Sequence, residues 1–298
     1  MQNLDAPFGQ FAGMLLREPG DAVSCVAAVV RELKNVAWFD GIQIMRVVKE
    51  SPLSKGLNEL QGRIERSDQA IYLDFRQFRS FDDYHRTVAT KTRKNLRNAL
   101  NRMRRAHEVE HHVTDDAVKD GGVIAQAFDE RLTWMELGGK TTPAFRDPDF
   151  RRLLEALPKA DPAISLLGFE LKTASDAVST QWGFRYQNRY YAYMSARNLG
   201  FDAFSPGQVH LGMVIKACHE LGIDVIELMA PPSEYKLKWT KMGKQIDDFS
   251  LALSPKGFIY LDIWHGKMRK ALKWAFDHFP KGVRRIATSL TNHNLRSP

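Results

Sequence analysis

Cysteine is scarce in this sequence, and long hydrophobic runs are absent. The 298 residues include two cysteines, Cys25 and Cys218, each within an apolar segment. Two isolated thiols cannot build a disulfide framework or a zinc site, so buried thiols in a reducing compartment are expected. No apolar run approaches about 18 residues, and the first residues lack the basic start and apolar centre of a secretory signal. We therefore expect a cytoplasmic protein without a transmembrane segment.

Acidic residues are missing from one stretch, Lys91–Ala106 (KTRKNLRNALNRMRRA), which contains seven basic residues. The net charge of the chain is +8, and this stretch carries +7, so all other residues sum to about +1. A protein that binds nucleic acid along its surface more often spreads its basic residues. The basicity of this chain is instead a local feature that needs its own explanation.

A helix over this stretch has two distinct faces, because successive side chains turn by about 100°. One face carries Leu96, Ala99, Leu100 and Met103, and the opposite face carries Lys91, Lys94, Arg97, Arg102 and Arg105, with Asn98 and Asn101 among them. The basic face can be a solvated surface, a surface that attracts an anionic ligand or substrate, or a nucleic-acid arm. The lack of interleaved aromatic residues disfavours the arm.

Metal-ligand clusters are also lacking. His107, His111 and His112 are close in sequence, but Val109 and Val113 alternate as in a strand. A strand would direct His111 and His112 to opposite faces, so we expect no metal site there.

The remaining patterns mix helices with strands. Helices are expected at 21–34, from Ser51, at 80–106, from Asp115 or Asp116 to 137, and at 147–157, 206–221 and 258–279. Strands are expected at 42–48, 70–75, 108–113, 163–172, 177–187, 190–198, 224–228 and 246–253. The three strands between 163 and 198 indicate an antiparallel meander, which a β–α–β step follows. No Gly/Ser-rich linker marks a domain boundary, which we place near residue 110.

The sequence Ser205-Pro206-Gly207-Gln208 reads as the start of a helix. Serine would cap the helix, proline would take its first position, and glutamine would complete a capping box. Gly207 leaves room for a ligand, and N–H groups at a helix N-terminus favour phosphate or carboxylate. An ordinary, well-capped helix explains the same residues. His210 falls on the apolar side of this helix, which favours a core histidine over a catalytic base.

Three polar residues follow the next strand. Glu227 lies at its predicted end, and Tyr235 and Lys236 follow a Pro-rich break. A carboxylate, a phenol and an amine near a strand end suit proton transfer, and they suit ordinary surface packing equally well.

The run QWGFRYQNRYYAYMSARNLGFDAFSPGQVHLGMVIKACHELGIDVIEL (181–228), followed by EYKLKW, resembles the C-terminal domain of the CelD-like acetyltransferases. These enzymes belong to the GNAT superfamily and are related to the Fem-type aminoacyltransferases. The shared pattern is two strands ending in a Tyr-rich run, a Ser-Pro-Gly helix start, a small-residue helix that closes on Gly before an acidic strand, and Tyr-Lys. The basic K-x-R-x-N-L-R-x-A helix also fits, so the resemblance covers about residues 85–275.

The resemblance implies an α/β (α+β) fold, with a mixed, largely antiparallel GNAT-like sheet flanked by helices. It implies two tandem halves, the first of them incomplete. Residues 1–110 would form the N-terminal half with the basic helix, residues 111–290 the acyltransferase domain, and residues 291–298 a tail.

The resemblance also implies acyl-CoA, such as acetyl-CoA, as the co-substrate, and no metal. The acyl group would move to an amine or hydroxyl of a cell-envelope or polysaccharide-related acceptor. Glu227 would act as the base, directly or through water, and Tyr235 would protonate the leaving thiolate.

The binding residues follow from the same resemblance. N–H groups near Ser205, Gly207 and Gln208 would hold the carbonyl and the phosphates. Lys236 would pair with a phosphate, an acceptor carboxylate or a nearby acid. Tyr193 and Arg197 would line the acceptor groove.

The sequence departs from the family pattern in three places. Glu227 replaces the usual Asp, Pro231 replaces Gly, and the Gln/Arg-x-x-Gly-x-Gly/Ala loop of standard GNAT enzymes is missing. Two alternatives therefore stay open. One is a Fem-type transferase that uses aminoacyl-tRNA, with the basic helix on RNA phosphates. The other is a catalytically degenerate GNAT fold that assists exopolysaccharide assembly.

Overall fold

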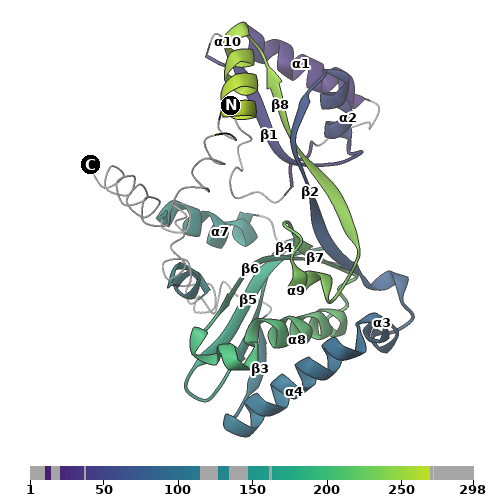
Figure 1. Ribbon diagram of the computed structural model, residues 1–298, viewed down its shortest axis with the longest axis vertical. Helices are drawn as coiled ribbons and strands as arrows, with labels where there is room; N and C mark the ends of the chain where they lie inside the picture. Colours follow the sequence, from purple (N-terminus) through teal and green to yellow (C-terminus); the bar gives the residue numbers. More distant parts are fainter. Residues whose placement is uncertain are drawn as a thin grey trace. The chain divides into compact units, whose positions relative to one another are not determined.

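The computed structural model describes residues 11–14, 21–36, 38–114, 127–133, 147–160, 163–268 and 271 (Figure 1). Packing divides the chain into two compact units, which we call the terminal unit (Met1–Ser67 with Ile246–Pro298) and the central unit (Asp68–Gln245). The predicted domain boundary near residue 110 is not tested by this packing and stays a prediction.

The terminal unit builds a small core between two helices and an antiparallel strand pair. Its elements are α1 (Ala22–Asn35), β1 (Gly41–Val48), α2 (Pro52–Glu59), α10 (Pro255–Phe258), the π-helix η4 (Ile259–Met268), and parts of β2 (Arg63–Asp74) and β8 (Gly243–Ala252). The start of α2 is as predicted, with Pro52 in the first turn and Ser51 accepting a hydrogen bond from the Ser54 N–H. Val26, Val47 and Phe249 lie in the core.

The central unit contains most of the sheet and the helices that cover it. Its elements are η2 (Phe75–Gln77), α3 (Phe81–Thr87), α4 (Thr90–Ala106), β3 (Glu110–Thr114), α7 (Pro148–Ala160), β4 (Ile164–Lys172), β5 (Ala177–Tyr186), β6 (Arg189–Arg197), η3 (Leu199–Phe204), α8 (Pro206–Glu220), β7 (Val225–Met229) and α9 (Glu234–Leu237). In Figure 1, α4 and α8 run side by side below the strands, and the contacts between the two helices agree with this view.

Eight strands are hydrogen-bonded in the order β1-β8-β2-β7-β6-β5-β4-β3. The β6–β7 pair is parallel, whereas the pairs β1–β8, β2–β7, β3–β4, β4–β5 and β5–β6 are antiparallel. A parallel pair needs a crossover, and α8 supplies it. The predicted mixed, largely antiparallel sheet flanked by helices is confirmed, as are the meander and the β–α–β step.

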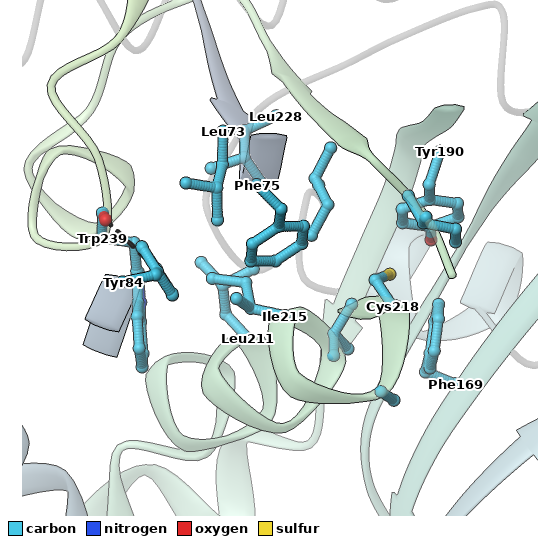
Figure 2. Packing of buried hydrophobic residues seen from close by; sticks show 14 of the residues in the cluster. Leu73, Phe75, Tyr84, Phe169, Tyr190, Leu211, Ile215, Cys218, Leu228 and Trp239 are labelled. Carbon is cyan, nitrogen blue, oxygen red and sulfur yellow. Dashed lines mark hydrogen bonds between the residues drawn. The ribbon is translucent and has the colours of Figure 1, made fainter. Parts of the chain in front are cut away.

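The core of the central unit forms where α8 packs on the sheet (Figure 2). Leu211, Ile215 and Cys218 of α8 meet side chains of the strands, including Leu73 and Leu228. The apolar stripe of α8 faces the sheet, and every second side chain of each strand points toward the helix. The two sets of side chains therefore pack together. Figure 2 also shows the buried hydroxyl of Tyr84, which donates a hydrogen bond to the Trp239 carbonyl at 3.1 Å.

Several predicted boundaries are wrong. The single helix expected at 80–106 is two helices, because the backbone is extended at Val88 and Ala89. Val88 is buried in the core, so packing overrides the helical pattern there. The expected final helix begins as α10 and continues as a π-helix to Met268. Its remainder lies outside the described residues, as do the predicted tail and most of the helix expected up to residue 137.

No helix within the described part of the chain is long and apolar enough to cross a membrane.

A β-bulge interrupts the pairing of β5 with β6. Trp182 pairs with Met194 and Gly183 pairs with Ala192, so Tyr193 is the extra residue. Gly183 is required at this point because a Cβ there would overlap the carbonyl oxygen of Tyr191. Bulges re-aim side chains next to functional sites.

We expect Gly183→Ala to lower the free energy of unfolding by about 1–3 kcal/mol, because the added methyl must push β5 and β6 apart. Gly207→Ala is the matched control, since a Cβ there would lie 3.9 Å from the Arg197 Cδ, an ordinary contact. Urea denaturation of both variants measures the difference. Equal unfolding midpoints would contradict the close approach at Gly183.

Candidate functional site

The N-terminus of α8 is the first part of the candidate site. Pro206 occupies the first turn, as predicted, but the predicted capping box is wrong. Ser205 has left-handed backbone angles (φ 51°, ψ 51°), and its side chain makes no capping hydrogen bond. Its carbonyl instead accepts the N–H groups of Gln208 and Val209. A non-glycine residue in this conformation carries strain of order 1 kcal/mol, and such residues cluster at functional sites.

Arg197 lies beside this helix terminus. Its Nε donates to the Asp202 carboxylate at 2.9 Å, and its Cδ lies near the space above Gly207. Asp202 therefore compensates the charge of this guanidinium beside the helix terminus. This places Arg197 with Ser205, Gly207 and Gln208 on the predicted cofactor side, although we predicted it in the acceptor groove.

A polar groove of about 630 Å³ joins this terminus to α4. Its lining consists of Asn95, Leu96, Asn98, Ala99, Asn101, Arg102 and Arg105 from α4, Ser205 and Gln208 from α8, and Lys238. The Lys238 ammonium donates to the Gln208 side-chain oxygen at 3.2 Å. Arg102 donates to the Ala203 carbonyl at 3.3 Å. Cations and amide side chains thus converge on a helix N-terminus, which is an environment suited to an anion.

The basic stretch is the amphipathic helix that its sequence predicts. Ala99 and Met103 of α4 are buried against a cluster that includes Val209 of α8. The residues of the predicted basic face, Lys91, Lys94, Arg97, Arg102 and Arg105, are exposed, whereas Arg93 is half-buried. The sequence did not identify Asn95 or Lys238 as groove residues. Asn95, Asn98 and Asn101 recur at every third residue. This spacing is the sequence signal that could have indicated the groove-lining face of α4.

The ladder between β6 and β7 is short. Within the described residues it runs from Arg189↔Val225 to Tyr191↔Glu227, although β6 continues to Arg197 and β7 to Met229. Among the described strands, the later residues of β6 are therefore paired only with β5, and Tyr193 is the extra residue of the bulge in that pairing.

Glu227 lies within β7 and not at its end. Its neighbours Ile226 and Leu228 pack in the core with α8, so its side chain is directed to the opposite face of the sheet. The carboxylate is buried, and its Oε1 contacts both Arg189 and Lys244, the latter at 2.8 Å. Its Oε2 has no hydrogen-bond partner among the described residues.

Tyr193 lies in an aromatic cluster on the same face as Glu227. Its ring centroid is 5.4 Å from that of Trp182 and 5.6 Å from that of Phe184, and Phe184 pairs with Tyr191 across the sheet. Trp182 is fully buried and stacks with Phe128, whereas Tyr193 and Phe184 are half-buried, so these two rings are available to pack against the body of an acceptor molecule.

Tyr235 and Lys236 lie on α9, just after β7. Burial is the main cause that raises the pKa of Tyr235, and the charge of Arg131 opposes this shift. Lys236 is buried, and its ammonium donates to the carbonyls of Met229 and Pro231, both at 3.0 Å. Among the described residues, the predicted pairing of Lys236 with an anion is not seen.

The structure thus separates the predicted residues into three groups. Ser205, Gly207, Gln208 and Arg197 surround the α8 N-terminus; Glu227 and Tyr193 lie on the other face of the sheet; Tyr235 and Lys236 follow β7. The catalytic and binding roles that the sequence indicated stay predictions.

Arg131 is a further residue that the sequence did not single out. It donates to the Ser195 carbonyl on β6 at 3.5 Å, and its charge acts on Tyr235. It therefore links the end of β6 to the phenol on α9.

His210 belongs to the core, and His111 is half-buried beside it. The His210 Nδ1 lies 3.0 Å from the Ser179 hydroxyl, and burial lowers the pKa of His210 to about 3. The prediction of a core histidine is therefore confirmed. His111 stacks on Phe169, whereas His112 is exposed beside Glu110, so the two neighbours face opposite sides as predicted.

One family model matches the central part of this chain. Residues 90–237 match the model described as the acetyltransferase (GNAT) domain. This range includes α4, the residues that line the groove except Lys238, the bulged β6 and α9. No curated protein matches the chain.

Solved structures agree with this fold. The chain is similar to FemX, with a TM-score of 0.57 and 11% identity over 86% of this chain and 85% of FemX. It is similar to L-PGS from Bacillus licheniformis, with a TM-score of 0.51 and 11% identity over 82% and 77% of the two chains. The C-terminal domain of a protein from Agrobacterium fabrum, assigned as a lysylphosphatidylglycerol synthetase, gives a TM-score of 0.53 and 12% identity over 82% and 79%.

The pKa of Lys236 makes the burial of its ammonium against the loop after β7 testable by the pH dependence of stability. Burial lowers the pKa of Lys236 from 10.5 to about 8, against a smaller opposing effect of Asp68. Between these values the unfolded chain binds more protons than the folded chain, so stability rises with pH.

We expect wild type to gain up to about 3 kcal/mol relative to Lys236→Met as pH rises through this window. Urea unfolding of both proteins across the window measures the gain. Parallel pH profiles would show that the Lys236 ammonium is not buried as described.

Proposed function

We propose that this protein is an acyltransferase that moves an acyl group from acyl-CoA to an amine or hydroxyl of a cell-envelope or polysaccharide-related acceptor, in the cytoplasm. The GNAT domain supports the reaction class. The observation that carries the proposal is the polar groove between α4 and the α8 N-terminus. A CelD-like role in polysaccharide production is part of this proposal and rests on the sequence resemblance.

The chemistry of the groove fits the phosphates of coenzyme A. Helix N–H groups, Arg102, Arg105 and Lys238 are donors or cations, and the amides of Asn95 and Asn98 add further donors. When bound, acyl-CoA supplies the thioester. Gly207 keeps the approach to the helix open, since it has no side chain.

The residues on the other side of β7 would act on the acceptor. We assign to Glu227 Oε2, the oxygen without a partner, the uptake of the acceptor proton, directly or through water. We assign to Tyr235 the delivery of a proton to the departing sulfur. Its raised pKa keeps the phenol protonated at neutral pH, as a proton donor requires. Tyr193 and its aromatic neighbours would contact the acceptor.

Arg105→Gln tests the donor site. Arg105 lines the groove, whereas the neighbouring Arg104 of the same helix is exposed outside it. We expect Arg105→Gln to weaken binding of acetyl-CoA about tenfold, because a charged contact to phosphate is lost. Arg104→Gln should bind as wild type does. Isothermal titration calorimetry measures both affinities.

Equal affinities of the two variants would place the phosphates elsewhere. If wild type binds neither acetyl-CoA nor longer acyl-CoA molecules, the proposal fails, and the degenerate assembly factor becomes the better interpretation.

Tyr235→Phe tests the proton donor. The variant keeps the ring and loses the hydroxyl, so we expect kcat to fall about a hundredfold while the affinity for acyl-CoA is kept. Release of free thiol in the presence of an identified acceptor measures the rate. An unchanged kcat would remove Tyr235 from the reaction.

Transfer from aminoacyl-tRNA is the second candidate function. Structural similarity to FemX and the exposed cations of α4 favour it. RNA phosphates would contact exposed cations all along α4, Arg104 included, so Arg104→Gln and Arg105→Gln should then weaken tRNA binding alike, with a steep dependence on salt. The same two variants therefore separate the two donors.

A further inference from the structure

The terminal unit exposes a group of large apolar side chains. These are Phe258, Ile259, Tyr260, Ile263 and Met268, which we call the apolar patch; each side chain is between 45% and 57% exposed. They follow one another along α10 and the π-helix η4. Single exposed apolar residues are normal, but five along two consecutive helical elements mark an interaction surface.

The apolar patch is contiguous. Ile259, Tyr260, Ile263 and Met268 line one hollow of about 410 Å³, together with Lys256. The other side of this segment is anchored in the terminal unit, because Leu261 is buried and its side chain lies against Gly41. The segment therefore presents an apolar surface from a fixed position.

The net charge of residues 255–298 indicates which kind of partner the apolar patch would bind. Residues 255–298 contain nine basic and two acidic residues, a net charge of +7. The basic stretch at 91–106 also carries +7, so the rest of the chain has a net charge of −6. The apolar patch thus lies in a strongly basic segment of an otherwise acidic protein.

We propose that the apolar patch docks on an anionic membrane surface. Apolar and aromatic side chains beside Lys and Arg are the features by which segments insert at a bilayer interface. Anionic lipid headgroups attract the cations, and this attraction brings the patch to the interface. A second copy of the chain is disfavoured because it would bring two segments of charge +7 together.

Vesicle binding by the full-length protein tests this inference independently of any enzymatic activity. We expect cosedimentation with vesicles of phosphatidylcholine containing phosphatidylglycerol, and much weaker binding to pure phosphatidylcholine. Ile259→Ser combined with Ile263→Ser should weaken binding at least about tenfold through the loss of apolar contact. Lys256→Gln should weaken it about fivefold through the loss of one charge.

Leu153→Ser is the matched control, because Leu153 is 52% exposed on α7 of the central unit. It should bind vesicles as wild type does, and circular dichroism should show that every variant is folded. The inference is overturned if wild type does not bind the anionic vesicles, or if the patch variants bind as well as Leu153→Ser. It is also overturned if sedimentation velocity shows a dimer that the Ile259/Ile263 variant disrupts.

Discussion

The parallel pairing of β6 with β7 is the constraint on which the candidate site depends. Parallel strands cannot be joined by a tight turn, so the chain must cross over through α8. The short helix η3 joins β6 to the crossover helix, and a Cβ on Gly207 would lie 3.9 Å from the Arg197 Cδ, so the N-terminus of α8 lies near the carboxyl end of the strand. The anion-favouring terminus beside Arg197 is thus a consequence of topology. The core that fixes it is the packing of Leu211 and Ile215 against the sheet.

The same strand pair separates two chemical environments. On the α8 side, cations and helix N–H groups surround an open groove. On the opposite face, Glu227 is buried, and Arg189 and Lys244 compensate its charge. A buried carboxylate without such partners would be strongly destabilising. The two environments lie on opposite faces of the sheet because adjacent residues of a strand face opposite sides, and among the described strands the later part of β6 is paired only with β5.

Local signals in the sequence predicted local structure well. Ser51-Pro52 started α2, the strand patterns from 163 to 198 formed the meander, and the valines around His111 and His112 gave their opposite orientations. Each of these features depends on residues a few positions apart. The resemblance to known acetyltransferases added the sheet topology, which periodicity alone does not provide.

The errors and omissions depend on tertiary contacts. Ser205 looked like a capping residue, but its left-handed backbone replaces side-chain capping. Lys236 looked available to an anion, yet it donates to two carbonyls of the loop after β7. The groove is lined by residues that are about a hundred positions apart in the sequence. No local pattern could therefore show that Asn98 and Gln208 line the same groove.

The position of the basic helix α4 affects the electrostatic energy of the folded protein. Arg102, Arg105 and Lys238 line a groove at a helix N-terminus. Their positive charges therefore lie near the positive end of the helix dipole. This arrangement opposes folding in the free protein, and mutual repulsion weakens as salt screens it. A bound anion reverses the sign of the interaction, since each cation then gains a partner. Binding of an anionic ligand in this groove would therefore stabilise the folded protein, which is the behaviour expected of a binding site and not of a solvated helix face.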